Sequence, residues 1–272
     1  MSLVFLHLSD IHFVAPGQLV AGVDPMRQMR SVLARIERLE TAPAFIVVSG
    51  DLTEDGSAEG YEVLNEVLTE LGGGTPVLLA LGNHDERATF RRVVLGAERS
   101  DARQPYCYSR LIDGLRVIVL DSTIPGEAGG ALGAAQLAWL EGELQMPATR
   151  GNLIVLHHAC RLAGPMHHYP QFIVREAAAL EALVARHRDR VVGVLAGHSH
   201  QANSAPFGGT LHATAPAVLV QLDFFAGEEY QPVPGAGFNL CQLDESGLIV
   251  HPVLIGGDGD GVIAGGGSRE VP

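Results

Sequence analysis

Five short apolar segments of this chain each end in side chains that can bind a metal ion. Aspartate, asparagine and histidine offer the oxygen and imidazole nitrogen atoms that divalent cations bind in proteins. Any one such motif is a weak signal, because a glycine and an aspartate after a strand often only form a turn. Five of them in succession instead predict one shared metal site. In chain order they are Asp10-Ile-His12, Gly50-Asp51, Gly82-Asn-His-Asp85, His157-His158 and Gly197-His-Ser-His200.

The kind and number of these side chains indicate what the site would hold. Because they include no thiolate, they favour Mn²⁺, Fe, Zn²⁺ or Co²⁺ and exclude an iron–sulfur cluster. Seven ligands are too many for one tetrahedral ion and are sensible for two ions, which a carboxylate such as Asp51 could bridge. The candidates are Asp10, His12, Asp51, Asn83, one of His157 and His158, His198 and His200.

The apolar segments that precede these motifs predict strands buried on both faces, because they are short and rich in Val, Leu and Ile. Ligands of open α/β sheets bind beyond the carboxyl ends of the strands, so residues as distant in sequence as Asp10 and His200 are expected to meet there. The predicted strands are Leu3–Leu8, Phe45–Val48, Val77–Leu81, Val117–Leu120, Leu153–Leu156 and Val191–Ala196.

Segments with helical spacing lie between several of these strands and predict an α/β architecture. Asp24 and Ser57 are expected to cap the first two helices, and two more are expected at Gly133–Gln145 and Val174–His187. Strands are also expected at Leu211–Phe225 and at Phe238–Leu254, the second folded into a hairpin. Residues 1–255 are expected to form one domain, and the glycine-rich residues 256–272 a disordered tail.

Composition limits the partners of the protein. The chain has 18 basic and 31 acidic residues, a net charge of −13, which argues against nucleic-acid polymers and anionic membranes. Three widely spaced cysteines fit a reducing compartment, and neither a signal peptide nor a membrane-spanning stretch is evident, so a cytoplasmic protein is expected. A homodimer or higher homo-oligomer stays open.

The ordered motifs resemble those of the calcineurin-like metallophosphoesterase family across residues 10–200. The resemblance implies a four-layer α/β/β/α sandwich with two mixed β-sheets and a dinuclear metal centre. Three further segments are similar to bacterial class III cyclic nucleotide phosphodiesterases and their glycerophosphodiesterase relatives. They are Gly50–Thr53, Gly82–Arg87 and Leu120–Thr123, the last followed by Pro125-Gly126.

The resemblance also implies a role for each residue. The first metal would be held by Asp10, His12, Asp51 and His200, and the second by Asp51, Asn83, His157 and His198. Relatives usually carry His-His-Pro-Pro, with the first histidine as the ligand, where this chain has His157-His158-Ala159-Cys160. His84 would stabilise or protonate the leaving oxygen, with Asp85 orienting it.

The implied reaction is hydrolysis of a small phosphodiester, such as a 3′,5′-cyclic nucleotide or a glycerophosphodiester, by in-line attack of a metal-bridging hydroxide. Two divalent ions, two carboxylates and a hydroxide leave the centre at about +1, so an acidic protein can still attract the substrate. A phosphomonoesterase or nucleotide pyrophosphatase on the same centre is the alternative. A non-catalytic scaffold is a third reading, but it would be expected to lack ligands.

Other polar residues have simpler interpretations. His7, His187, His212 and His251 are expected to be structural, whereas His167 and His168 would either line the substrate cleft or be solvated. Arg87, Arg91 and Arg92 are expected to face solvent on a helix, with a phosphate contact as the alternative.

Overall fold

Two β-sheets lie against each other in the computed structural model, which describes residues 2–97, 101–225 and 229–256. The first sheet has the order β13-β12-β1-β2-β3. Its strands are β1 (Leu3–Leu8), β2 (Ile46–Ser49), β3 (Val77–Ala80), β12 (Ala236–Asp244) and β13 (Gly247–Ile255). The second sheet has the order β4-β5-β6-β7-β9-β8. Its strands are β4 (Tyr108–Ile112), β5 (Leu115–Val119), β6 (Asn152–Val155), β7 (Val191–Ala196), β8 (Asn203–Phe207) and β9 (Thr210–Thr214).

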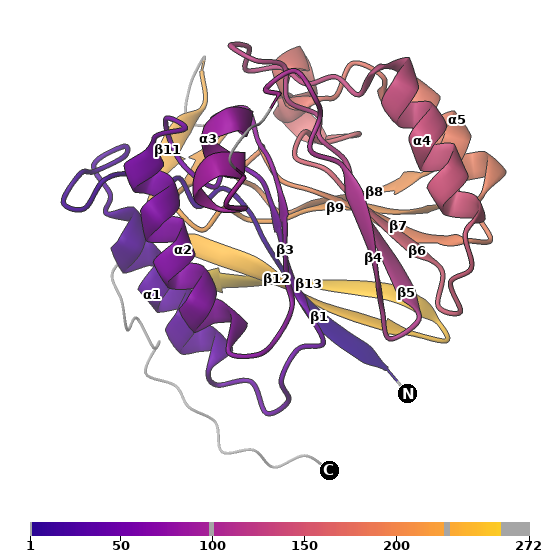
Figure 1. The fold of residues 1–272 in the computed structure, drawn as a ribbon, viewed down its shortest axis with the longest axis horizontal. Helices are drawn as coiled ribbons and strands as arrows, with labels where there is room; N and C mark the ends of the chain where they lie inside the picture. Colours follow the sequence, from indigo (N-terminus) through magenta and orange to yellow (C-terminus); the bar gives the residue numbers. More distant parts are fainter. Residues whose placement is uncertain (1, 98–100, 226–228, 257–272) are drawn as a thin grey trace.

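Helices cover the outer face of each sheet (Figure 1). The first sheet carries α1 (Pro25–Ile36) and α2 (Ala58–Gly72), with the short α3 (Arg87–Val93) beside α2. The second sheet carries α4 (Gly133–Gln145) and α5 (Ala177–Arg186). Both sheets combine parallel and antiparallel pairs, so the predicted four-layer sandwich with two mixed sheets is confirmed.

Local sequence explains where the first two helices begin. The Asp24 carboxylate accepts hydrogen bonds from the Met26 and Arg27 amides at 2.9 and 3.3 Å, and Pro25 occupies the first turn, where its missing N–H costs nothing. The Ser57 hydroxyl accepts from the Gly60 amide at 3.2 Å. Both predicted caps are confirmed.

Three apolar layers hold the sandwich together. One joins α1 and α2 to the first sheet, one joins α4 and α5 to the second sheet, and the third lies between the two sheets. Representative members of the central layer are Phe5 and Val47 from the first sheet and Val117 and Leu195 from the second, all fully buried. The parallel strands are therefore covered on both faces, which is why they form uninterrupted apolar runs in the sequence.

The predicted strand at Leu211–Phe225 is wrong in its middle. β9 ends at Thr214 and the short β10 (Gln221–Asp223) pairs with β11 (Gln231–Val233), while residues 215–220 are buried but irregular. The Val218 and Leu219 amides instead donate to the carbonyls of Ser9 and Asp10 at 2.9 and 3.1 Å. An apolar run shows burial but cannot distinguish a strand from a buried loop whose hydrogen-bond partners lie elsewhere.

The glycine-rich tail lies, apart from Gly256, outside the described residues, so the domain boundary at residue 255 stays a prediction. None of the helices among the described residues is both long enough and apolar enough to cross a membrane. Two 3₁₀ turns, η1 (Gly164–His168) and η2 (Pro170–Phe172), follow β6, and the Gln171 carbonyl of η2 lies 3.1 Å from Nε2 of His198, which follows β7.

His7 and His212 are fully buried within the sandwich and are held neutral. The Asn239 amide donates to His7 Nδ1 at 3.2 Å, so Nε2 carries the proton and donates to the Ser49 hydroxyl at 2.9 Å. Burial, with a smaller contribution from His212, lowers the pKa of His7 to about 3, and burial lowers the pKa of His212 to about 4. Both pKa values lie below the pKa of histidine in the unfolded chain, about 6.5. These histidines therefore contribute their full stabilisation of the folded protein above about pH 6.5, and that stabilisation is lost as the pH falls towards the folded-state pKa.

We expect each of these histidines to cost about 2 kcal/mol of unfolding free energy between pH 7 and pH 5. The measurement is urea unfolding at both pH values, in chelator, for the wild type, His212→Gln and the exposed control His251→Gln. The difference in unfolding free energy between the wild type and His212→Gln should change by about 2 kcal/mol over that range. The unfolding free energy of His251→Gln should change with pH as that of the wild type does. Parallel losses in all three proteins would contradict the assignment of His212.

Candidate metal centre

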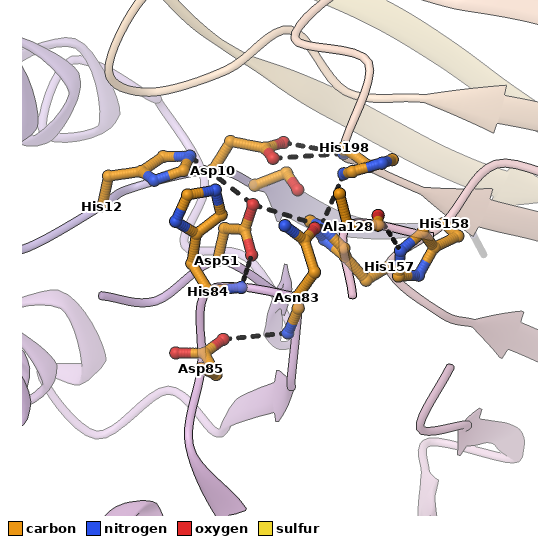
Figure 2. Close-up of polar contacts among 12 residues, drawn as sticks. Asp10, His12, Asp51, Asn83, His84, Asp85, Ala128, His157, His158 and His198 are labelled. Carbon is orange, nitrogen blue, oxygen red and sulfur yellow. Dashed lines mark hydrogen bonds and ion pairs between the residues drawn. The ribbon is translucent and has the colours of Figure 1, made fainter. Parts of the chain in front are cut away.

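The seven predicted ligand side chains meet at the carboxyl ends of five strands. β1, β2 and β3 are followed by the oxygen-rich part of the set, and β6 and β7 by the remaining histidines. All members of the set except His200 are labelled in Figure 2. Ligand-capable atoms of Asp10, His12, Asp51 and His200 all lie within 4.8 Å of one another. Those of Asp51, His157 and His198 do so as well. The Asp51 carboxylate therefore belongs to two adjacent groups of ligand-capable atoms, each of a size that suits one ion.

Backbone conformation is unusual at the same residues. Asp10, His12, Asp51, His198 and His200 all have positive φ angles, between +49° and +66°. This region is sparsely populated by residues other than glycine, and such conformations persist where the surrounding structure imposes them, commonly at functional sites. The chain thus turns sharply just after β1, β2 and β7, which places these side chains over the ends of the strands.

Each histidine of the predicted ligand set donates one ring N–H to an oxygen atom of a residue outside that set. His12 Nδ1 lies 2.6 Å from Glu54 Oε2, and His157 Nδ1 lies 2.8 Å from the Ser49 carbonyl. His200 Nδ1 and His198 Nε2 lie 2.8 and 3.1 Å from the carbonyls of Val220 and Gln171. Because carbonyl and carboxylate oxygens accept, these nitrogens carry the protons and the other nitrogens present lone pairs. Metal-bound histidines are oriented in this way.

The lone pairs face each other across the site. His12 Nε2 lies 3.2 Å from His200 Nε2, and His157 Nε2 lies 3.1 Å from His198 Nδ1. Two lone pairs at this separation repel, so a proton or a metal cation must lie against each facing pair. The donors therefore fit two divalent cations.

The carboxylates stabilise positive charge at the same place. Burial disfavours a charged His157 ring, but Asp51, whose Oδ2 is 3.3 Å from Nε2, outweighs burial and raises the pKa of His157 to about 9. For His12, burial is likewise outweighed by Glu54 and Asp51, and its pKa is raised. In return, the neighbouring histidines hold the pKa of Asp51 well below its usual range despite burial. The electrostatic environment of this crevice is suited to cations.

The structure distinguishes the two adjacent histidines after β6. His157 Nε2 faces the cluster, 3.1 Å from Asn83 Oδ1. His158 lies on the far side of His157 and bonds the Ser122 hydroxyl and the Ala128 carbonyl at 2.8 and 3.1 Å (Figure 2). Burial, together with His157, lowers the pKa of His158 to about 3. These contacts favour His157 as the ligand.

His84 lies at the open side of the cluster, with 37% of its side chain exposed. Its backbone amide donates to Asp51 Oδ1 at 3.0 Å, and its Nδ1 lies 2.6 Å from the Glu54 carbonyl. A contact from Asp85 to this ring was expected, but the Asp85 carboxylate is used elsewhere. It accepts from the backbone amides of Leu52 and Gly82 at 3.1 and 2.9 Å. Asp85 therefore fixes the loop around Asp51 rather than the ring of His84.

Burial, reinforced by the charge of Asp51, raises the pKa of Asp85 to about 6. The Tyr61 hydroxyl also donates to Asp85 at 3.0 Å. This half-buried carboxylate accepts from several donors, which is consistent with a structural role beneath the cluster.

Arg87 differs from its expected place on a solvent-facing helix surface. It is 7% exposed, and its Nε and Nη2 atoms donate to the two Asp121 carboxylate oxygens at 2.7 and 3.1 Å. Nη2 also donates to the Thr123 carbonyl at 2.8 Å. The Arg87 guanidinium therefore pairs with both Asp121 oxygens and links α3 to the residues that follow β5. Its donors are used within the protein, so a phosphate contact is not the role of Arg87.

Glu54 is not among the site residues predicted from the sequence. It lies three residues after Asp51, so an acidic residue within the motif was the only signal available. The carbonyl partners of the other histidines had no signal, because every residue has a carbonyl group.

Glycines leave room for the carboxylates. A Cβ atom at Gly82 would lie 2.2 Å from Asp51 Oδ1, and one at Gly197 would lie 1.8 Å from the Ser9 hydroxyl and 2.9 Å from Asp10 Oδ2. Backbone approach this close requires glycine. The glycines of these two motifs are therefore part of the site and not only of its turns.

A sandwich of two mixed sheets, with one carboxylate shared between two buried clusters of ligand-capable side chains, has the features expected of a dimetal hydrolase. The sequence model of the family described as calcineurin-like phosphoesterase matches residues 3–202. A probable cyclic nucleotide phosphodiesterase from Rhodococcus erythropolis is 34% identical over 262 residues, which cover 92% of this chain and 82% of that protein. This chain belongs to the calcineurin-like phosphoesterase family and has the residues for a dimetal centre.

Two further proteins are similar to this chain. A glycerophosphodiester phosphodiesterase from Enterobacter lignolyticus is 28% identical over 225 residues, covering 82% of this chain and 80% of that protein. The solved structure of a purple acid phosphatase from yellow lupin aligns with a TM-score of 0.65 at 14% identity, covering 93% of this chain and 51% of that chain. The second likeness shows the shared fold alone.

Proposed function

We propose that this protein hydrolyses small phosphodiesters, either 3′,5′-cyclic nucleotides or glycerophosphodiesters. The observation that carries the proposal is the Asp51 carboxylate, which two groups of ligand-capable atoms share beside one accessible histidine, His84. The names of the relatives support a diester as substrate, since they are a cyclic nucleotide phosphodiesterase and a glycerophosphodiester phosphodiesterase.

Two divalent cations would be held by the seven side chains that meet at the strand ends. When bound, such ions lower the pKa of water towards neutrality and neutralise charge on the phosphate. The donors suit Mn²⁺, Fe, Zn²⁺ or Co²⁺. Asp10, His12, Asp51 and His200 would hold one ion, and Asp51, Asn83, His157 and His198 the other.

His84 would serve the leaving group. Its Nδ1 donates to the Glu54 carbonyl, so Nε2 is the nitrogen that can accept a proton and pass it to the leaving oxygen. With 37% of its side chain exposed, it is accessible to a substrate in a way that the buried His12 and His157 are not. Asp85 contributes by holding the loop on which Asp51 lies.

The net charge of −13 keeps nucleic-acid polymers outside the proposed substrate class. The cytoplasm is the proposed location, supported by Cys107, Cys160 and Cys241, which are all free. A homodimer or higher homo-oligomer stays a proposal that light scattering of the full chain would test.

Comparison of a diester with a monoester tests the proposed activity. With added Mn²⁺ we expect kcat/KM for bis(p-nitrophenyl) phosphate to exceed that for p-nitrophenyl phosphate by at least about tenfold. The ratio measures the preference directly, because an enzyme discriminates between two substrates by how strongly it stabilises each transition state. A chelator should remove the activity and Mn²⁺ should restore it. Assays with 3′,5′-cyclic AMP and glycerophosphoethanolamine would then distinguish the two diester classes. Faster turnover of the monoester would favour the phosphomonoesterase alternative and exclude the diesterase.

A further inference from the structure

The loops that follow β1 and β2 are joined along their backbones beyond the ends of the strands. The His12 amide donates to the Asp51 carbonyl at 2.9 Å, and the Phe13 amide donates to the Leu52 carbonyl at 3.0 Å. The Glu54 amide then donates back to the Phe13 carbonyl at 3.0 Å. This continued parallel pairing places Glu54 beside His12, 42 positions away in the sequence.

Glu54 makes a short contact with each of two histidines of the site. Its Oε2 atom accepts from His12 Nδ1 at 2.6 Å, and its backbone carbonyl accepts from His84 Nδ1 at 2.6 Å. Oε2 is also 3.7 Å from His84 Nδ1. The rings of His12 and His84 meet edge to face, with centroids 4.9 Å apart. One residue therefore contacts a metal-ligand histidine with its side chain and the leaving-group histidine with its main chain.

The loop that carries Glu54 is itself anchored. The preceding residue, Thr53, is fully buried, and its amide and hydroxyl both donate to Asp85 Oδ1, at 3.2 and 3.3 Å. The Leu52 amide donates to the other Asp85 oxygen at 3.1 Å. The Glu54 carbonyl is thus held in a defined position, while its side chain, 34% exposed, is fixed through His12.

We propose that Glu54 is a positioning residue that orients His12 through its carboxylate and His84 through its carbonyl, an inference that rests on the proposed function of the site. The carboxylate fixes the proton on His12 Nδ1 and strengthens Nε2 as a metal ligand. Partners of this kind are worth about 10- to 100-fold in metal affinity. The carbonyl fixes the proton of His84 on Nδ1, which leaves Nε2 for the leaving oxygen. Glu54 thereby links the first metal position to the leaving-group side of the site.

Metal titration of side-chain variants tests the carboxylate contact. The full chain is stripped with a chelator and titrated with Mn²⁺ by calorimetry, for the wild type, Glu54→Ala and Glu54→Gln. We expect Glu54→Ala to bind one of the two ions about 10- to 100-fold more weakly than the wild type. The near-isosteric Glu54→Gln keeps an acceptor but loses the charge, so its affinity for that ion should lie between those of the wild type and Glu54→Ala. Asp55→Asn is the matched control, because it removes the adjacent, exposed carboxylate.

Nitrogen-15 NMR of the histidine rings in the Zn²⁺-loaded protein supplies a readout that does not depend on activity. Glu54→Ala should alter the Nδ1–H signal of His12 and retain that of His84, because the backbone carbonyl remains. Equal Mn²⁺ affinities for Glu54→Ala and Asp55→Asn, or an unchanged His12 signal, would overturn the proposal. A wild type that binds two ions without hydrolysing any diester would refute the proposed function, while the affinity difference would still decide the role of Glu54.

Discussion

Asp51→Asn is expected to lower kcat/KM for a phosphodiester by about 10³-fold or more and to reduce the bound metal below two ions per chain. Metal stabilisation of phosphate charge contributes several kcal/mol, and each 1.36 kcal/mol changes the rate about tenfold. Asp51 is the residue that both groups of ligand-capable atoms share, so its replacement weakens both positions at once. Asparagine has nearly the same shape and can still accept from the His84 amide, now 3.0 Å from Asp51 Oδ1.

The loss should therefore arise from the missing charge and not from a collapsed loop. Metal content by atomic emission, measured alongside diester hydrolysis, checks both parts of the expectation. Asp55→Asn makes the same change at an exposed carboxylate four positions away and should keep wild-type activity. A fully active Asp51→Asn protein would rule out Asp51 as the carboxylate shared by two metal positions.

His84→Gln is expected to lower kcat for a cyclic nucleotide by about 10²- to 10⁴-fold, the usual contribution of a positioned acid. The effect should be much smaller for bis(p-nitrophenyl) phosphate, because p-nitrophenolate is a weak base that departs without a proton. Metal content should not change. His84 does lie in a third group of ligand-capable atoms, with His12 and Glu54, but its Nδ1 is bonded to the Glu54 carbonyl and the ring belongs to neither of the two groups that share Asp51.

The comparison of leaving groups separates proton transfer from a general loss of structure. His251→Gln, an exposed histidine on β13, is the control and should hydrolyse both substrates like the wild type. Equal losses of activity for both substrates in His84→Gln would show that the ring binds phosphate or holds the loop and does not protonate the leaving oxygen.

Much of the fold could be predicted because its signals are local. Buried parallel strands leave continuous apolar runs, and β1, β3 and β7 begin where those runs begin. The helix caps at Asp24 and Ser57 depend on residues within one turn. Edge strands such as β4 and β8 were missed because they are half exposed and lack such runs.

The residue types at the ends of the strands can be read from the chain alone, and they predict that Asp51 and the histidines of the five motifs could meet at a metal site. Which ring of the His157-His158 pair faces inwards depends on packing, because neighbouring side chains point in different directions. The tertiary structure also revealed Glu54 beside His12 and redirected Asp85 to the loop backbone. The physical reason is that these roles are set by hydrogen bonds between segments distant in the chain, many of them to main-chain groups that every residue has.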